Sequence, residues 1–236
     1  EIVTKRHQHL GQSNFSDESQ HYSRNVNPNS YSKMIDFLCN KGFIVIRIGD
    51  PNVLIKVKHK KNYIDYGNSA FKSSYLDLAF GANCNFFIGS SSGAIFLSAI
   101  FNKPILGLNL SMPFSFSPTG KCNEIGVPKL IRNKKTKQVL SFKEIYDCDV
   151  YKVRNTEDDL MKTFEVIENN ENDMIIAAEE MIDFIKNPHA NKHKYDETNN
   201  LIRSLNKKFE FDAESLSKFS LKFLEKHRHI LLKETL

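Results

Sequence analysis

Residues 85–109, NFFIGSSSGAIFLSAIFNKPILGLN, constrain the fold more than any other stretch of the chain. An apolar run over 84–89 predicts a buried strand, and the polar turn Ser90–Gly93 follows it. The apolar stretch 94–102 then has helical length, and a second strand-like run follows over 104–109. Two buried strands joined by a helix lie parallel in one sheet. The stretch therefore predicts an α/β fold.

The remainder of the first 110 residues continues this alternation of strands and helices. Short or apolar runs at 1–6 and 43–48 predict strands, and residues 31–40 carry apolar side chains at helical spacing before a glycine stop. We therefore predict a Rossmann-like parallel sheet with flanking helices, containing residues 43–48, 84–89 and 104–109 and ending near residue 110. The polar loop 7–30 is too long for a mere connection and predicts a functional segment.

The C-terminal part of the chain predicts helices. Ser141 and Glu144 form the pattern of a capping box, and Thr156 with Asp159 repeats it. Amphipathic helices are expected over 171–186 and 212–232, with a polar linker between them. Residues 110–129 read as a loop rich in proline, serine and glycine. We expect one domain over 1–150 and a helical extension over 151–236.

Charge and composition narrow the class of ligand. The 33 basic and 28 acidic residues leave a net charge of +5, which suits a small anion and is too weak to indicate nucleic-acid binding. No apolar run approaches the ~20 residues that cross a bilayer. The four cysteines lack paired spacing, so we expect reduced thiols and a cytoplasmic protein.

Residues Ser90–Gly93 have two interpretations, a helix cap or a phosphate cradle. A cap needs one serine, whereas this turn has three in a row followed by a glycine. Ligands of open α/β sheets sit beyond the carboxyl ends of the strands, where this turn is predicted. Helix-start N–H groups and serine hydroxyls there would bind an anion. The turn is neither a Walker A loop nor a spaced-glycine dinucleotide fingerprint.

Three arginines are candidates for holding a diphosphate, because the planar guanidinium binds two oxygens at once. Arg6 ends the first predicted strand, and Arg24 lies on the far side of the following loop. Arg47 lies within an apolar run. It is either an edge residue, a ligand-facing residue, or the partner of a carboxylate such as Asp65 or Asp77.

The loop after the last predicted strand supplies two more candidates. Glu124 is placed to hydrogen-bond a sugar hydroxyl or simply to be solvated, and Lys129 lies near it. Three histidine pairs, His7/His9, His189/His193 and His227/His229, have no carboxylate or cysteine at a ligand spacing. We therefore predict no metal site.

Several segments, taken in order, resemble one family. They are YSRN, YSKMIDFLCNKGFIVIRIGDP, YIDYGNSAFKSSYLDLAFGANCNFFIGSSSGAIFLSAIFNKPILGLNLSMP, GVPKLIRNKKTKQVLSFKEI, and NTEDDLM followed by AAEEMIDFI. Together they are similar to a bacterial family of glycosyltransferases whose genes occur with those for surface-polysaccharide synthesis. The chain departs from the pattern at three points. No histidine stands two residues before Arg6, Ser23 replaces a tyrosine, and Ile48 replaces a methionine.

This resemblance implies the C-terminal, donor-binding half of a GT-B enzyme, an architecture of two facing Rossmann-like domains. Residues 1–150 would bind a nucleoside-diphosphate sugar, and the start on a strand favours a first domain outside this chain. By analogy with fucosyltransferases, Arg6 would be catalytic. The expected binding residues are Arg24, Arg47, Gly49, Asp50, Ser90, Ser91, Ser92, Gly93, Glu124 and Lys129.

The implied reaction transfers a hexosyl or deoxyhexosyl group to a saccharide or lipid-linked acceptor. It needs no metal or other cofactor and involves no nucleic acid. The resemblance also allows peripheral association with the inner face of the membrane. Two alternatives share the architecture: a nucleotide-sugar epimerase, and a non-catalytic module that binds nucleotide sugars.

Overall fold

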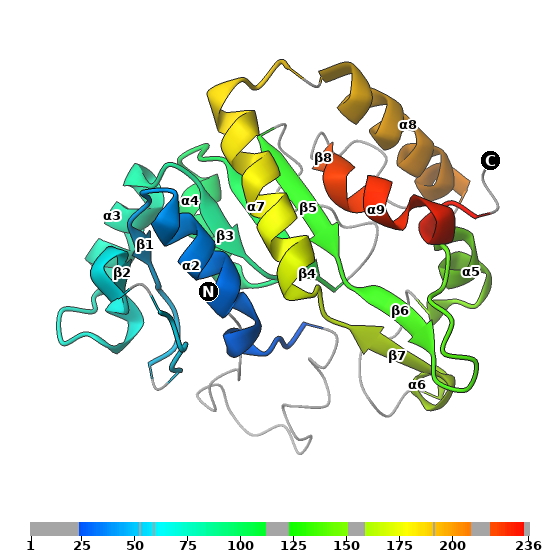
Figure 1. The fold of residues 1–236 in the computed structure, drawn as a ribbon, viewed down its shortest axis with the longest axis horizontal. Helices are drawn as coiled ribbons and strands as arrows, with labels where there is room; N and C mark the ends of the chain where they lie inside the picture. Colours follow the sequence, from blue (N-terminus) through cyan, green and yellow to red (C-terminus); the bar gives the residue numbers. More distant parts are fainter. Residues whose placement is uncertain are drawn as a thin grey trace.

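The computed structural model describes residues 24–51, 53–58, 60–111, 123–150, 159–190, 192–208 and 218–233 (Figure 1). The first elements are η1 (Pro28–Tyr31), α2 (Ser32–Asn40), β1 (Val45–Ile46), η2 (Lys60–Asn62), β2 (Tyr63–Ile64), η3 (Tyr66–Asn68) and α3 (Ser74–Asn83). The central elements are β3 (Phe87–Gly89), η4 (Gly93–Ile95), α4 (Phe96–Ala99), β4 (Ile105–Leu110), β5 (Glu124–Pro128), β6 (Leu130–Asn133) and α5 (Phe142–Asp147). The last are α6 (Leu160–Thr163), β7 (Phe164–Ile167), α7 (Glu171–Lys186), α8 (Lys192–Lys208), β8 (Lys218–Phe219) and α9 (Leu221–Leu231).

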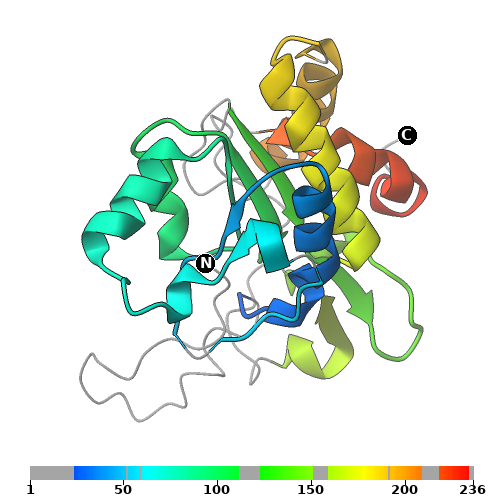
Figure 2. The same cartoon turned by 60° about the vertical axis from the view of Figure 1, so that its left-hand side comes forward.

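A parallel four-stranded sheet of order β3-β4-β5-β8 is the centre of a mixed α/β fold. Strand β4 is buried along its whole length, as expected for a strand covered on both faces. Figure 2 shows α3 and α4 on one face of this sheet and α2 and α7 on the other. The parallel pairing of the strands predicted over 84–89 and 104–109 is confirmed.

Successive residues of the central strands pack into two different hydrophobic cores. Ile105 packs with Phe87 and Ile95 beneath α4, whereas Leu106 joins the larger core against α2, α7 and α9. This alternation follows from the two-residue period of a strand. Both faces of the sheet are therefore closed by helices.

The prediction that residues 43–48 belong to this same sheet is wrong within the described structure. Only Val45–Ile46 form a strand, and β1 pairs in parallel with β2 in a separate two-stranded sheet. An apolar cavity of about 390 Å³ lies between β1 and β3. The edges of the two sheets face each other across that cavity.

The sheet also continues beyond residue 110, contrary to expectation. Strand β5 occupies part of the predicted loop 110–129, and β8 pairs with β5 from the far end of the chain. Strands β6 and β7 form an antiparallel pair. The C-terminal extension is therefore not only helical, because it contributes one strand to the sheet and one to this pair.

Local signals for helix ends were more reliable than the predicted lengths of segments. The capping box of Ser141 and Glu144 is present, and Gly42 ends α2 with a φ of 90°. Helix α7 has the predicted bounds, but the polar linker expected after it is α8. The helix expected over 212–232 is described only from 218, as β8 and α9. Thr156 lies outside the described residues.

Candidate functional site

Three neighbouring strands end at the same edge of the sheet. Because β3, β4 and β5 are parallel, their carboxyl ends at Gly89, Leu110 and Pro128 meet there. Each is followed directly by a polar residue, namely Ser90, Ser111 and Lys129. We define the carboxyl-edge cluster as Ser90, Ser111 and Lys129 together with Ser91, Ser92 and Arg24.

The serine turn is held at this edge from two sides. The Nε–H group of Arg24 donates to the carbonyl oxygen of Ser91 at 2.8 Å. The Ser91 hydroxyl accepts from the backbone N–H of Ser111 at 3.1 Å and contacts the Ser111 hydroxyl at 3.3 Å. Two of the predicted residues, Arg24 and Ser91, are thus in direct contact. Ser91 has a structural role, because its hydroxyl joins β3 to β4.

The hydroxyls of Ser90 and Ser92 behave differently. Both oxygens are buried, and neither has a hydrogen-bond partner among the described residues. Ser90 is 0% exposed and Ser92 is 5% exposed. A buried hydroxyl without a partner costs about 1–3 kcal/mol, so two of them in one turn require an explanation. A ligand that accepts hydrogen bonds would supply one.

Gly93 adds open space to the same turn. A Cβ atom placed on Gly93 would meet no protein atom within 4 Å. Protein packing therefore does not require a glycine here, and the space over its backbone is clear. The helix predicted over 94–102 is shorter than expected, since η4 and α4 together end at Ala99. A helix this short stabilises an anion through its dipole less than the sequence led us to expect. Side chains must therefore supply most of the attraction for an anion.

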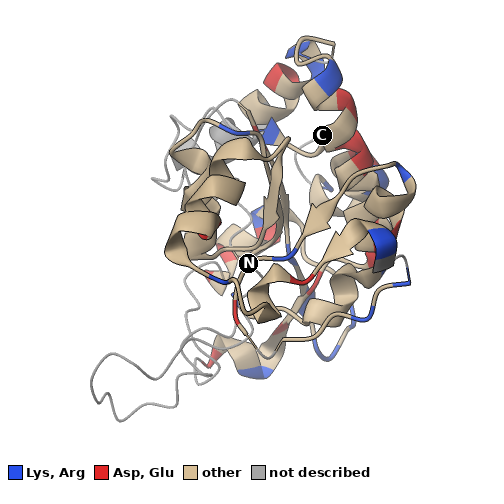
Figure 3. Cartoon of the chain, turned by 90° about the vertical axis from the view of Figure 1, so that its left-hand side faces the viewer, with Lys and Arg blue, Asp and Glu red and all other residues tan. Residues whose placement is uncertain are grey.

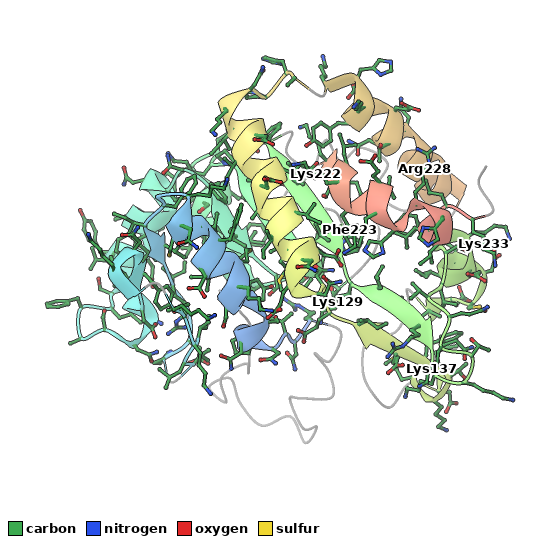
Figure 4. The ribbon with its side chains drawn as sticks, viewed as in Figure 1. Lys129, Lys137, Lys222, Phe223, Arg228 and Lys233 are labelled. Atoms are coloured by element: carbon green, nitrogen blue, oxygen red, sulfur yellow. The ribbon has the colours of Figure 1, made fainter. Side chains whose placement is uncertain are left out.

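Lys129 is the second cation at this edge. It is 5% exposed, and its ammonium group donates to the carbonyl oxygen of Asn25 at 2.5 Å. Burial lowers the pKa of Lys129 to about 8, and the nearby Glu168 opposes that shift. Figure 4 shows Lys129 where β5 ends, beneath the start of α7, far from the surface lysine Lys137. Because Asn25 is next to Arg24 in the chain, the two cations belong to one edge.

The helical layer next to the serine turn contributes no positive charge. Residues 74–102 contain one charged side chain, Asp77. Figure 3 shows α3 and α4 almost entirely in tan, the colour of uncharged residues. Among the described residues, the cations of the carboxyl-edge cluster are Arg24 and Lys129.

A pair of asparagines that no sequence pattern predicted fixes the strand ends at the cluster. The side chains of Asn109 and Asn169 accept from each other's backbone N–H groups at 2.6 and 2.7 Å. Asn169 also donates to the carbonyl oxygen of Pro128, and Asn109 donates to the Tyr31 hydroxyl. The only available signal was one asparagine within the apolar run ILGLNL.

This asparagine pair coincides with an irregularity in the sheet. The register between β4 and β5 shifts between Gly107 and Leu110, and Asn109 has a φ of 53°. Bulges and left-handed residues other than glycine concentrate next to functional sites. Burial also raises the pKa of the Tyr31 hydroxyl, which stays protonated at this edge.

Arg47 is the partner of a carboxylate, one of the three roles considered for it. Its Nε–H group donates to Asp65 at 2.5 Å, and Nη1 donates to the carbonyl oxygen of Asp50 at 3.1 Å. The nearby Gly67 leaves room for the guanidinium, since a Cβ there would lie 2.5 Å from Nη2. The Lys72 ammonium contacts the carbonyl oxygen of Gly49. Gly49 and Asp50 thus belong to the surroundings of Arg47.

Glu124 does not join the carboxyl-edge cluster. It is the first residue of β5, where it pairs in register with Ile105, whereas Lys129 follows the last. At about 3.3 Å per residue, the length of the strand separates the two side chains by roughly 15 Å. Glu124 is also buried rather than solvated in a loop. Its expected place in a loop after the last predicted strand is therefore wrong.

The remaining expectations concern Arg6, a metal site and a membrane-spanning helix. Arg6 lies outside the described residues. Within the described ranges, no three His, Cys, Asp or Glu side chains gather closely enough to hold a metal ion. No described helix has the length and apolar character needed to cross a membrane.

Comparison with known proteins gives no relative for this chain. No protein-family model, no curated protein and no solved structure matches it.

Proposed function

We propose that this chain is the donor-binding part of a GT-B glycosyltransferase. In this proposal it binds a nucleoside-diphosphate sugar at the carboxyl-edge cluster, and the sugar is transferred to the hydroxyl of a saccharide or lipid-linked acceptor. The resemblance to the polysaccharide glycosyltransferase family supplies the reaction class. The parallel sheet with helices on both faces is compatible with one Rossmann-like domain of such an enzyme.

One observation carries the proposal: the buried hydroxyls of Ser90 and Ser92 lack partners at the carboxyl edge of a parallel sheet. Phosphate oxygens accept hydrogen bonds from such hydroxyls. The open space over Gly93 allows a phosphate to approach the backbone closely. Arg24 and Lys129, at the same edge of the sheet, would provide positive charge for a dianionic group.

The chemistry that these groups would support is departure of the diphosphate. Negative charge grows on the leaving diphosphate as the sugar bond breaks, and fixed donors aimed at that charge lower the barrier. In the proposed role, Ser90 and Ser92 hold the leaving group and Arg24 fixes the turn. Arg6 is assigned as the catalytic arginine, because an arginine fork stabilises two diphosphate oxygens at once.

The test is calorimetric titration of the chain with UDP and GDP, and with the matching nucleosides. We expect at least one diphosphate to bind and its nucleoside to bind at least about tenfold more weakly, because the phosphates make the main contacts. Equal affinity for the nucleoside would contradict a diphosphate site at this edge. Release of free nucleotide from a panel of nucleotide sugars, with and without saccharide acceptors, then distinguishes transfer from epimerisation and from binding alone.

A further inference from the structure

The helical layer formed by α3 and α4 is apolar on its outer side as well as on its inner side. Its inner side chains, among them Leu76, Phe80 and Ala99, pack into the smaller hydrophobic core beneath the layer. A helix that is hydrophobic all round is usually buried on every side. Here six large apolar side chains of the layer are instead 41–80% exposed, and we call them the apolar outer face: Phe71, Tyr75, Leu78, Phe96, Ile100 and Phe101.

The two helices bring these side chains onto one layer. Helices α3 and α4 pack against each other. Gly81 permits their close approach, because a Cβ atom there would lie 2.5 Å from a backbone carbonyl oxygen of α4. Tyr75 and Leu78 lie one turn apart on α3, and Phe96 and Ile100 lie one turn apart where α4 begins and ends. Six of the nine large apolar side chains that are exposed among the described residues thus belong to this layer.

The size of the apolar outer face matches one side of a stable interface. At about 200 Å² for a fully exposed side chain of this size, the exposed parts of the six amount to roughly 700 Å². A standard interface buries about 800 Å² on each partner, whereas the largest apolar patch of a typical monomer is about 300–600 Å². The face is therefore larger than a monomer commonly leaves in contact with water.

The charges favour a second copy of the chain over a lipid surface or a strongly charged partner. Residues 74–102 contain no lysine or arginine, and Figure 3 shows this layer almost entirely in tan. An anionic membrane surface attracts clustered basic side chains, which this layer does not have. A nearly neutral apolar face, by contrast, can meet its own copy without repulsion between like charges.

The composition of the face also fits an interface between identical chains. Such interfaces are more apolar than others, and charged residues are depleted at their centre while aromatic residues are enriched. Four of the six side chains of the apolar outer face are aromatic. Lys72 and Lys103 flank the layer in the sequence, as expected for the polar rim that surrounds an interface.

We propose that the apolar outer face joins two copies of this chain in a two-fold symmetric dimer. In such a dimer the same surface of each copy contacts the other. The layer covers the face of the sheet opposite α2 and α7 (Figure 2), and none of its six side chains belongs to the carboxyl-edge cluster. Dimerisation is therefore independent of the proposed function.

Sedimentation velocity of the full chain over a range of concentrations tests the proposal. We expect a species with twice the 27.2 kDa mass of one chain and a dissociation constant at or below about 10 µM. Tyr75→Glu should weaken the dimer at least about 100-fold, because each copy would bury an unpaired carboxylate. This variant should fold, since the first turn of α3 favours acidic residues and already contains Asp77. The control is Leu54→Glu, which changes a similarly exposed side chain outside the face and should leave the dimer intact.

Intermolecular nuclear Overhauser contacts identify the surface without any variant. In a mixture of isotope-labelled and unlabelled chains, contacts from the Tyr75 and Phe96 rings to the other copy would support the proposal. A chain that stays monomeric at every concentration, or a dimer that Tyr75→Glu and Ile100→Glu both leave intact, would overturn it. Binding of a monomeric chain to phosphatidylglycerol vesicles that Tyr75→Glu abolishes would also overturn it, because a lipid surface would then cover the face.

Discussion

Replacing Ser92 with alanine separates a ligand-binding hydroxyl from a structural one. The Ser92 hydroxyl is buried without a partner among the described residues, which costs about 1–3 kcal/mol in the ligand-free chain. Ser92→Ala removes that cost and leaves only a small void. We therefore expect the free energy of unfolding without ligand to stay the same or to rise by about 1 kcal/mol, which shifts Tm upward by roughly 2–4 °C.

Nucleotide binding should change in the opposite direction. A hydrogen bond to a charged phosphate contributes about 1.5–3 kcal/mol, so Ser92→Ala should weaken nucleoside-diphosphate binding by roughly 10- to 150-fold. Thermal unfolding followed by circular dichroism measures the first effect, and calorimetry measures the second. A stability that rises while affinity falls is the expected signature of a group left unpaired for a ligand.

Ser98→Ala is the matched control. Ser98 is also 0% exposed and lies on α4, but its hydroxyl is 3.6 Å from the Cys84 sulfur. This variant should lose about 0.5–1.5 kcal/mol of stability and keep its nucleotide affinity. If Ser92→Ala instead lowers stability as Ser98→Ala does and binds nucleotide normally, the Ser92 hydroxyl is paired within the protein and the reasoning is refuted.

Two further predictions concern the charged residues. Because burial lowers the pKa of Lys129 from 10.5 to about 8, its positive charge is present below pH 8 and is lost above it. Diphosphate affinity measured by calorimetry should therefore fall as pH rises above about 8. Lys129→Met should abolish this dependence, whereas Lys137→Met at the exposed hairpin should not, and an unchanged pH profile in Lys129→Met would exclude Lys129 from the site. Asp65→Asn should destabilise the chain by about 2–3 kcal/mol in chemical denaturation, because it leaves the buried Arg47 charge uncompensated. Nucleotide affinity should stay the same in Asp65→Asn, and a large loss of affinity would instead place Arg47 at the ligand.

The sequence predicted those parts of the fold that depend on local patterns. Strands β3 and β4 are largely apolar, and the cap at Ser141 depends on residues only three positions apart. Strand β5 was missed because Glu124, Gly126 and Pro128 interrupt its apolar character. Its burial comes from pairing with β4 and β8, which no local pattern encodes. Helix α8 was missed because its sequence is largely polar.

The candidate site likewise has parts that local sequence patterns predicted and parts that they did not. The serine turn was predicted because a strand followed by small polar residues has a known place at the sheet edge. The Asn109–Asn169 pair could not be predicted, since the two residues are 60 positions apart and meet only when β7 leads into α7. Glu124 was misplaced for the reason that β5 was missed. Without β5, Glu124 was assigned to the loop after the last predicted strand, whereas it is the first residue of β5.

The carboxyl edge of the sheet contains both a hydrogen-bonded pair of asparagines and two serine hydroxyls without hydrogen-bond partners among the described residues. The asparagine pair ties β4, β5 and the start of α7 together through hydrogen bonds of 2.6–2.7 Å, despite the left-handed backbone at Asn109. If packing alone had shaped this edge, its serines would be bonded as completely as its asparagines. Ser91 is bonded in that way, but Ser90 and Ser92 on either side of it are not. The backbone of the turn is fixed at its centre, where Arg24 donates to the Ser91 carbonyl oxygen and Ser111 donates to the Ser91 hydroxyl. A preorganised turn with two unpaired donors is what tight binding of a phosphate requires, since ordering the site then costs little when the ligand arrives.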